Sequence, residues 1–80
     1  MSKEILFFSA PWCAPCKQMK LMLNESIRDE LSLKIIDITE DMELAADYQI
    51  MTIPTFVVVE DGKEVTRKSG ASTIDALRNM

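Results

Sequence analysis

The stretch ILFFSAPWCAPCK, residues 5–17, contains the only two cysteines of this 80-residue chain, Cys13 and Cys16. An apolar run over residues 5–8 leads into them, and a helix-patterned segment follows. A strand that ends in Cys-x-x-Cys at the start of a helix presents a reversible dithiol. The spacing lets the two sulfurs close a small disulfide ring, and the helix N-terminus favours a thiolate on the first of them. We therefore predict electron exchange through Cys13 and Cys16.

Length and composition predict one domain over residues 1–80, at the small end of what folds alone. The hydrophobic share of 48% is ordinary for a globular chain. A net charge of −4 without any basic cluster argues against partners such as nucleic acid or an anionic membrane.

The chain shows no apolar run near the ~20 residues needed to span a bilayer. It also shows no secretory signal ahead of the first predicted strand, so we expect a cytoplasmic location. There, a lone pair of thiols usually means redox chemistry or metal binding. Zinc needs about four ligands. Because the chain has no histidine and only these two thiols, a zinc site would require a dimer, and we favour redox chemistry.

The rest of the chain alternates strand and helix patterns. Apolar and β-branched runs predict strands over 3–9, 33–38, 55–59 and 63–68. Helical spacing predicts helices over 14–30, over 42–48 with Asp41 as its cap, and from Ser72 onward with Asp75 in a capping box. Asp61-Gly62 predicts a hairpin turn between the last two strands.

This βαβαββα order predicts an α/β protein with a four-stranded mixed sheet and helices on both faces. Two βαβ crossovers predict that the first three strands run parallel, and the hairpin adds an antiparallel edge strand. We interpret Met19, Met22 and Met51 as core residues rather than as a ligand set.

The chain resembles the thioredoxin family in motifs that occur in the family's order: Trp12-Cys13-x-Pro15-Cys16-Lys17, Ile53-Pro54-Thr55 at the start of a strand, Asp61-Gly62 and Gly70-Ala71. The match covers nearly the whole chain from Ile5 onward. The family's extra amino-terminal strand and helix have no counterpart, which leaves a core of glutaredoxin size carrying thioredoxin-type motifs.

The resemblance implies a thioredoxin-like sheet of order 2-1-3-4 and a cis peptide bond at Ile53-Pro54, facing the sulfurs. It implies that Cys13 is the attacking nucleophile and Cys16 the more buried resolving thiol. It also implies an apolar docking surround for the substrate, made of Trp12, Ile53, Pro54, Gly70 and Ala71.

Two positions depart from the family's pattern. Phe7 stands where thioredoxins usually carry a buried aspartate, and Ile35 stands in place of its usual lysine companion. The aspartate is thought to handle the proton of the buried thiol, so we expect water or the Cys13 thiolate to serve here, with slower deprotonation of Cys16.

The function implied by the resemblance is that of a monomeric thiol–disulfide oxidoreductase that reduces protein disulfides. A thioredoxin-reductase-type flavoprotein would recharge it, and it would need no cofactor beyond its own redox-active disulfide. Two alternatives stay open. One is a glutaredoxin-like redoxin that uses glutathione or donates electrons to ribonucleotide reductase. The other is a thioredoxin-like binding module whose thiols are dispensable.

Overall fold

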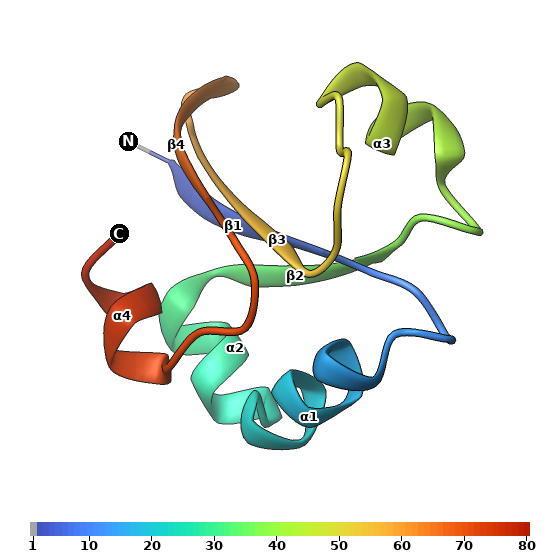
Figure 1. The fold of residues 1–80 in the computed structure, drawn as a ribbon. Helices are drawn as coiled ribbons and strands as arrows, with labels where there is room; N and C mark the ends of the chain where they lie inside the picture. The colour runs from blue at the N-terminus through green and yellow to red at the C-terminus, as the bar shows by residue number, and fades with distance from the viewer. Residues whose placement is uncertain (1) are drawn as a thin grey trace.

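A sheet with helices packed on it is the frame of the protein, seen in a computed structural model that describes residues 2–80 (Figure 1). Its elements in chain order are β1 (Lys3–Ser9), α1 (Ala14–Met22), α2 (Glu25–Leu31), β2 (Leu33–Asp37), α3 (Met42–Asp47), β3 (Thr55–Glu60), β4 (Lys63–Ser69) and α4 (Ile74–Arg78). The four predicted strands are all present, with ends within one residue of the prediction.

The four strands lie in the order β2-β1-β3-β4, which confirms the predicted order. β1 and β2 are parallel, and β3 and β4 form an antiparallel hairpin. The predicted parallel orientation of β1 and β3 is wrong, because these two central strands run antiparallel, with Phe8 opposite Thr55 and Lys3 opposite Glu60.

The connection between β2 and β3 begins and ends at the same edge of the sheet. A helix of six residues rises only about 9 Å, whereas the seven-residue β1 is roughly 23 Å long. α3 by itself is therefore too short to carry the chain back along the sheet. β3 starts at the edge where β1 and β2 end, and this places residue 54 beside the end of β1.

The predicted helix over 14–30 is two helices. α1 ends at Met22, and the side chain of Asn24 accepts a hydrogen bond from the backbone N–H of Ile27 (3.0 Å), so that Asn24 becomes the N-cap of α2. An asparagine side chain that satisfies a free N–H favours a new helix start over continuation of the old one. Met22, at the last position of α1, is 42% exposed and does not join the buried stripe that includes Met19.

The other local predictions were correct or displaced by one position. Asp41 caps α3 by accepting from Leu44 N–H (3.2 Å), as predicted. The cap of α4 is Thr73, which accepts from Ala76 N–H (3.1 Å), rather than Ser72. The Asp61-Gly62 turn is confirmed, with φ angles of 51° and 82° that suit the two central positions of a tight hairpin turn.

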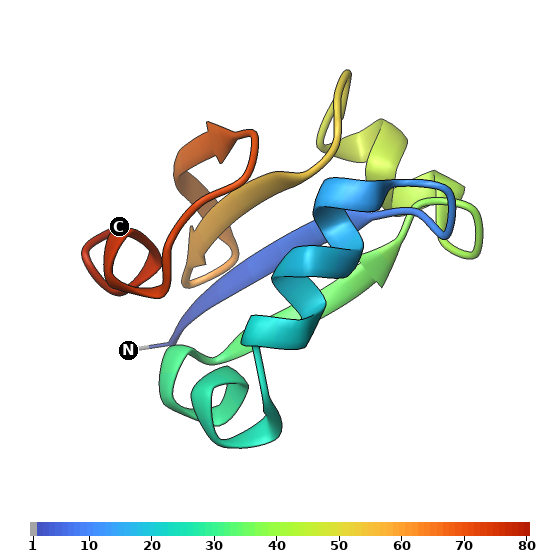
Figure 2. The ribbon, with the colours of Figure 1, turned by 60° about the horizontal axis from the view of Figure 1, so that its bottom comes forward.

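Helices cover both faces of the sheet, as predicted (Figures 1 and 2). We call the side packed by α1, α2 and α4 the dithiol face and the side packed by α3 the opposite face. The buried residues of the dithiol face are Ile5, Phe7, Ala10, Cys13, Cys16, Met19, Leu23, Leu33, Phe56, Val58 and Leu77. Those of the opposite face are Leu6, Phe8, Val57 and Val59, against which α3 packs Leu44 and Ala45, followed by Tyr48.

Phe7 lies at the centre of the dithiol face. Its ring is fully buried and stacks on Phe56 with the centroids 4.7 Å apart. Where thioredoxins usually carry a buried aspartate, this chain thus has a phenylalanine that stacks on a second ring. Ile35 packs against the same buried residues of the dithiol face.

We expect Phe7→Ala to lower the free energy of unfolding by about 3–5 kcal/mol, because it removes a buried ring and leaves a cavity. The free energy of unfolding of a small domain is about 5–15 kcal/mol, so the substitution would remove a large share of the stability. Urea unfolding monitored by circular dichroism measures it. Val65→Ala, at an exposed position of β4, is the matched control and should stay within about 0.5 kcal/mol of the parent. Equal effects of the two substitutions would contradict this account of the core.

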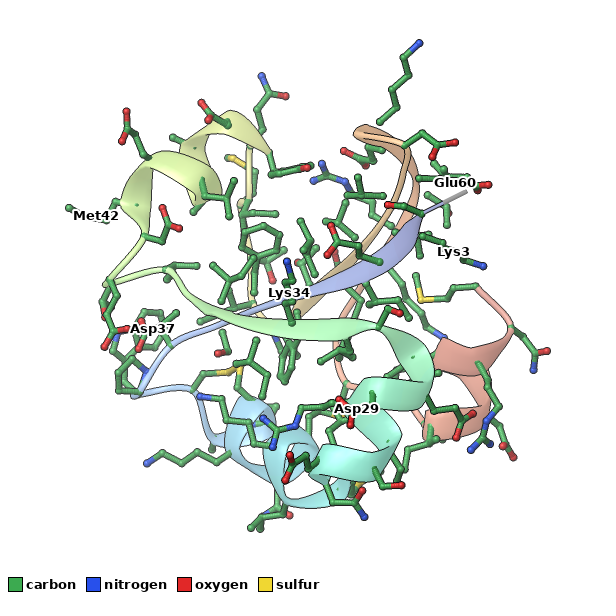
Figure 3. All side chains as sticks on the ribbon, turned by 180° about the vertical axis from the view of Figure 1, so that it is seen from behind. Lys3, Asp29, Lys34, Asp37, Met42 and Glu60 are labelled. Carbon is green, nitrogen blue, oxygen red and sulfur yellow. A yellow bond between two sulfur atoms is a disulfide. The ribbon has the colours of Figure 1, made fainter. Side chains whose placement is uncertain are left out.

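The turn after β2 is fixed by the Asp37 carboxylate (Figure 3), which accepts hydrogen bonds from the side-chain O–H (2.6 Å) and backbone N–H (2.8 Å) of Thr39. These bonds lower the pKa of Asp37, with the Thr39 hydroxyl as the largest cause.

A lowered carboxyl pKa stabilises the fold above the group's unfolded pKa, and this stability is lost as the pH falls through the folded pKa. Thr39→Val removes the hydroxyl donor, so we expect the pKa of Asp37 to rise and acid unfolding to begin at a higher pH. An NMR titration of the Asp37 carboxyl carbon measures the shift, and an unchanged pKa would contradict the assignment.

Candidate redox site

The two cysteines lie at the start of α1, just after the loop that follows β1. After β1 ends at Ser9, the backbone N–H of Cys13 donates to Ala10 C=O (3.1 Å) and turns the chain into the helix. Cys13 is the N-cap of α1, and its Sγ accepts a hydrogen bond from the backbone N–H of Cys16 (3.3 Å). Cys13 and Cys16 are joined as a disulfide with their Cα atoms 5.2 Å apart.

The electrostatics of this helix end favour negative charge on Cys13. The first turn of α1 contains Pro15 and no acidic residue, so nothing there cancels the partial positive charge of the free N–H groups. Of the two cysteines, Cys13 is 6% exposed and Cys16 is fully buried. The cysteine whose sulfur accepts the capping hydrogen bond is therefore also the less buried of the two.

The loop that contains Ile53 and Pro54 lies at the edge of the sheet where β1 ends. The peptide bond between Ile53 and Pro54 is cis, as the resemblance implied. Ile53 packs against both core clusters, including the one that contains Cys13 and Cys16. Within residues 2–80, the backbone N–H and C=O of Ile53 have no hydrogen-bond partner. An extended polypeptide could pair with these groups in the manner of an added strand.

Gly70 ties the end of β4 to this loop, because its N–H donates to Pro54 C=O (2.8 Å). Its φ of 91° favours glycine, whereas a Cβ there would meet no atom within 4 Å, so conformation rather than space requires this residue. Ala71 follows and is exposed. The fold thus brings the loops that carry Gly70, Pro54 and Cys13 to one side of the molecule.

An apolar pocket of about 350 Å³ is lined in part by Trp12, the residue before Cys13, and we call it the Met51 pocket. Its lining residues are Trp12, Ile38, Ile50, Met51, Thr52 and Ile53.

The prediction that Met51 is a core residue is wrong, since it lies in the loop between α3 and β3 and is 91% exposed. Sequence reasoning missed Ile38, Ile50 and Met51 as candidate site residues. The signal that could have found the last two is their position just ahead of Ile53-Pro54.

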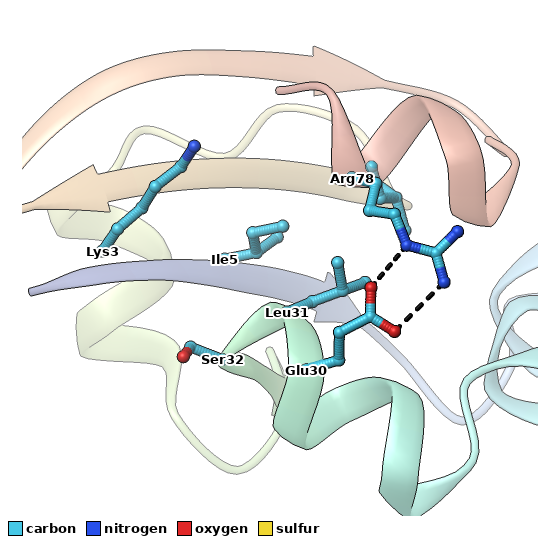
Figure 4. Close-up of a pocket in the computed structure, with 7 residues that line it drawn as sticks. Lys3, Ile5, Glu30, Leu31, Ser32 and Arg78 are labelled. Carbon is cyan, nitrogen blue, oxygen red and sulfur yellow. Dashed lines mark hydrogen bonds and ion pairs between the residues drawn. The ribbon is translucent and has the colours of Figure 1, made fainter.

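A second pocket, of about 370 Å³, lies at the opposite end of β1 (Figure 4). Its charged side chains are already paired: Arg78 with Glu30 and Asp75, and Lys3 Nζ with the backbone oxygen of Met80 (2.7 Å). The ion pair lowers the pKa of Glu30 and raises that of Arg78, mainly through their hydrogen bonds. This pocket lies where the ion pair between Arg78 and Glu30 joins α4 to α2.

Within residues 2–80, the buried side chains are apolar apart from Ser9 and Thr55, so no carboxylate is buried beside Cys16. The same residues contain no group of three or more His, Cys, Asp or Glu side chains arranged to hold a metal ion. None of the helices in this part of the chain is long and apolar enough to cross a bilayer.

The burial of the two sulfurs predicts which cysteine reacts. In the reduced protein under native conditions, we expect a limited amount of iodoacetamide to alkylate Cys13 and to leave Cys16 unmodified until the chain is unfolded. Alkylation requires access and a thiolate, and Cys13 is both the less buried of the two cysteines and the one whose sulfur accepts the capping hydrogen bond. Peptide mapping by mass spectrometry identifies the labelled residue. Preferential labelling of Cys16 in the folded protein would contradict this reading.

Comparison with known proteins finds thioredoxins by family model, by sequence and by structure. The family model for Thioredoxin matches residues 2–80. A thioredoxin of Bacillus subtilis is 38% identical over 76 residues, which cover 91% of this chain and 73% of that protein. A thioredoxin of Staphylococcus aureus is 34% identical over 70 residues, which cover 84% of this chain and 67% of that protein. The structure of Fasciola hepatica thioredoxin matches with a TM-score of 0.82 at 35% identity, over 96% of this chain and 75% of that one.

Proposed function

Because this chain belongs to the thioredoxin family and is a thiol–disulfide oxidoreductase, we propose that it works as a reductant of protein disulfides, with Cys13 as the nucleophile and Cys16 as the resolving thiol. One observation carries the assignment of roles. The Cys13 sulfur is the N-cap of α1 and accepts the Cys16 N–H, so the same donor is available to a Cys13 thiolate after reduction.

The reaction proceeds in two exchanges. The Cys13 thiolate attacks one sulfur of the substrate disulfide, forms a mixed disulfide and releases the other substrate sulfur as a thiolate. Cys16 then loses its proton and attacks Cys13 Sγ, which releases the second substrate thiolate and forms the Cys13–Cys16 disulfide. The substrate gains two electrons and the protein loses two, and solvent supplies the protons that the substrate thiolates take up.

Docking of the substrate is assigned to the surround of the dithiol, where Trp12 and Ala71 are exposed and Pro54 is buried. We propose that Trp12, Ile53, Pro54, Gly70 and Ala71 form this surface. It is supported by the 70% exposure of Trp12 and by the unpaired backbone groups of Ile53. Since no carboxylate is buried beside Cys16, water or a thiolate has to take the proton of Cys16, and we expect this step to be slow.

Family membership implies disulfide-bearing substrates and a reductase partner in general. More specifically, we propose a monomer over residues 1–80 that acts in the cytoplasm, needs no added cofactor and takes electrons from a thioredoxin-reductase-type flavoprotein. Ribonucleotide reductase is a candidate recipient. Reduction by glutathione instead of the flavoprotein would favour a glutaredoxin-like function.

The assignment of roles is tested by insulin reduction, with NADPH and thioredoxin reductase as one electron source and glutathione as the other. We expect Cys13→Ser to lower the rate to that of the uncatalysed reaction and to trap no substrate. Cys16→Ser should accumulate a mixed disulfide with insulin through Cys13, because the resolving thiol is missing. Non-reducing gels with peptide mapping identify the trapped bond, and Val65→Ala is the control for handling and folding.

Three results would contradict the proposal. They are full activity of Cys13→Ser, a trapped bond to Cys16 in that variant, and insulin reduction by neither electron source in the parent protein. Biological activity that survives loss of both thiols would instead favour a binding module.

A further inference from the structure

β2 is an outer strand of the sheet, and within residues 2–80 no strand pairs with its outer edge (Figure 2). The N–H of Ile5 donates to Ser32 C=O (3.1 Å), so the even-numbered residues of this segment turn their backbone groups toward β1. The odd-numbered residues Leu33 and Ile35 turn theirs outward, and neither has a backbone hydrogen-bond partner in the described part of the chain. Unpaired backbone groups along a strand edge are a template for pairing with another extended chain.

The two outer edges of the sheet differ in chemistry. β4 has the sequence KEVTRKS, in which four of the seven residues are charged and all are exposed. Charged side chains on an edge strand oppose pairing with other chains. β2 has the sequence LKIID, in which three of the five residues are apolar, and its lysine, Lys34, is paired with Glu4 (3.0 Å). β2 is therefore the edge that remains open to a further strand.

A groove of about 680 Å³ follows this open edge, and we call it the β2 groove. On the dithiol face it is lined by Ile35 of β2 and Arg28 of α2. On the opposite face it is lined by Ile36 of β2 and by Leu44 and Tyr48, which belong to α3 and its end. The groove shares no lining residue with the Met51 pocket, so it is a separate surface.

Arg28 is the charged residue of the β2 groove that lacks a partner within residues 2–80. Its Nε atom is buried and has no hydrogen-bond partner there, although the side chain as a whole is half-buried. The other two arginines of the chain are each paired with a glutamate. Asp41, which also lines the groove, caps α3. A guanidinium that is partly removed from water gains more from a carboxylate than an exposed one does, so the groove favours an acidic partner.

We propose that the β2 groove binds an extended segment of a partner protein as a fifth strand of the sheet, and that this segment carries an Asp or Glu side chain for Arg28. The surface lies outside the redox site, and the inference does not depend on the proposed function. Side chains of an added strand alternate between the two faces of the sheet. The acidic side chain on the dithiol face is therefore flanked by two side chains that pack against Ile36 and Leu44 on the opposite face. The partner segment has the pattern apolar-acidic-apolar.

The probe is a short peptide, blocked at both ends, with Val-Glu-Val at its centre and threonines on either side. It is titrated into isotope-labelled oxidised protein, and NMR follows each backbone amide. We expect saturable shifts of the Leu33 and Ile35 amides at peptide concentrations below about 1 mM. Hydrogen exchange at these two amides should slow on binding, because they gain a partner. The amides of Lys34 and Ile36, which face β1, should change less.

Arg28→Gln removes the charge from the groove, so we expect the dissociation constant of the peptide to rise about tenfold. A peptide with Gln in place of Glu should bind the parent protein about tenfold more weakly as well. Because both changes remove the same contact, their combination should weaken binding little more than either alone. Lys68→Gln is the matched control, since it removes one positive charge from β4 at the other edge, and it should bind the peptide as the parent does.

Strand pairing itself is tested with peptides that are N-methylated at alternate residues, because only one of the two sets of N–H groups faces β2. Methylation of one set should abolish binding, and methylation of the other should leave it unchanged. Equal effects of the two sets, equal effects of Arg28→Gln and Lys68→Gln, or no saturable shift in β2 up to about 1 mM peptide would overturn the inference. Shifts of the β2 amides with protein concentration alone would also overturn it, because a second copy would then fill the groove.

Discussion

The hydrogen bond from the Cys16 N–H to the Cys13 sulfur is the interaction on which this site depends. It exists because β1 is buried on both faces, ends at Ser9, and passes directly into a turn that starts α1. The sulfur of Cys13 thereby occupies the position in which helices usually place a serine, threonine or aspartate oxygen. A side chain with a capping role in the folding of α1 is also the proposed nucleophile, which would couple local folding to chemistry.

The direction of β3 completes the site. The connection through α3 leaves the chain at the edge where β1 and β2 end, and the chain enters β3 from there. The cis Ile53-Pro54 bond immediately precedes β3 and so lies beside the end of β1, next to the dithiol. The Gly70 hydrogen bond to Pro54 then brings in the end of β4. Had β3 been parallel to β1, these loops would lie at opposite ends of the sheet.

The sequence was sufficient for most local signals, although the predicted cap of α4 was displaced by one residue. Continuous apolar runs predicted the strands, and Asp41 and Asp61-Gly62 predicted a cap and a turn. The sheet order was implied by the resemblance to the thioredoxin family and is confirmed. The sequence failed where two local signals competed or where distance mattered. Asn24 interrupted a helical stripe that was otherwise regular, and the order of elements wrongly predicted that β3 runs parallel to β1. Met51 was misread because hydrophobicity alone does not separate a core residue from an exposed loop residue.

Ultraviolet titration of the thiolate in the reduced Cys16→Ser protein tests the central claim most directly, because Cys13 is then the only thiol that titrates. If the end of α1 stabilises negative charge on Cys13, its pKa lies well below the value of about 8.5 found for free cysteine. A Cys13 thiol that titrates at about 8.5 or above in the folded protein would contradict the account.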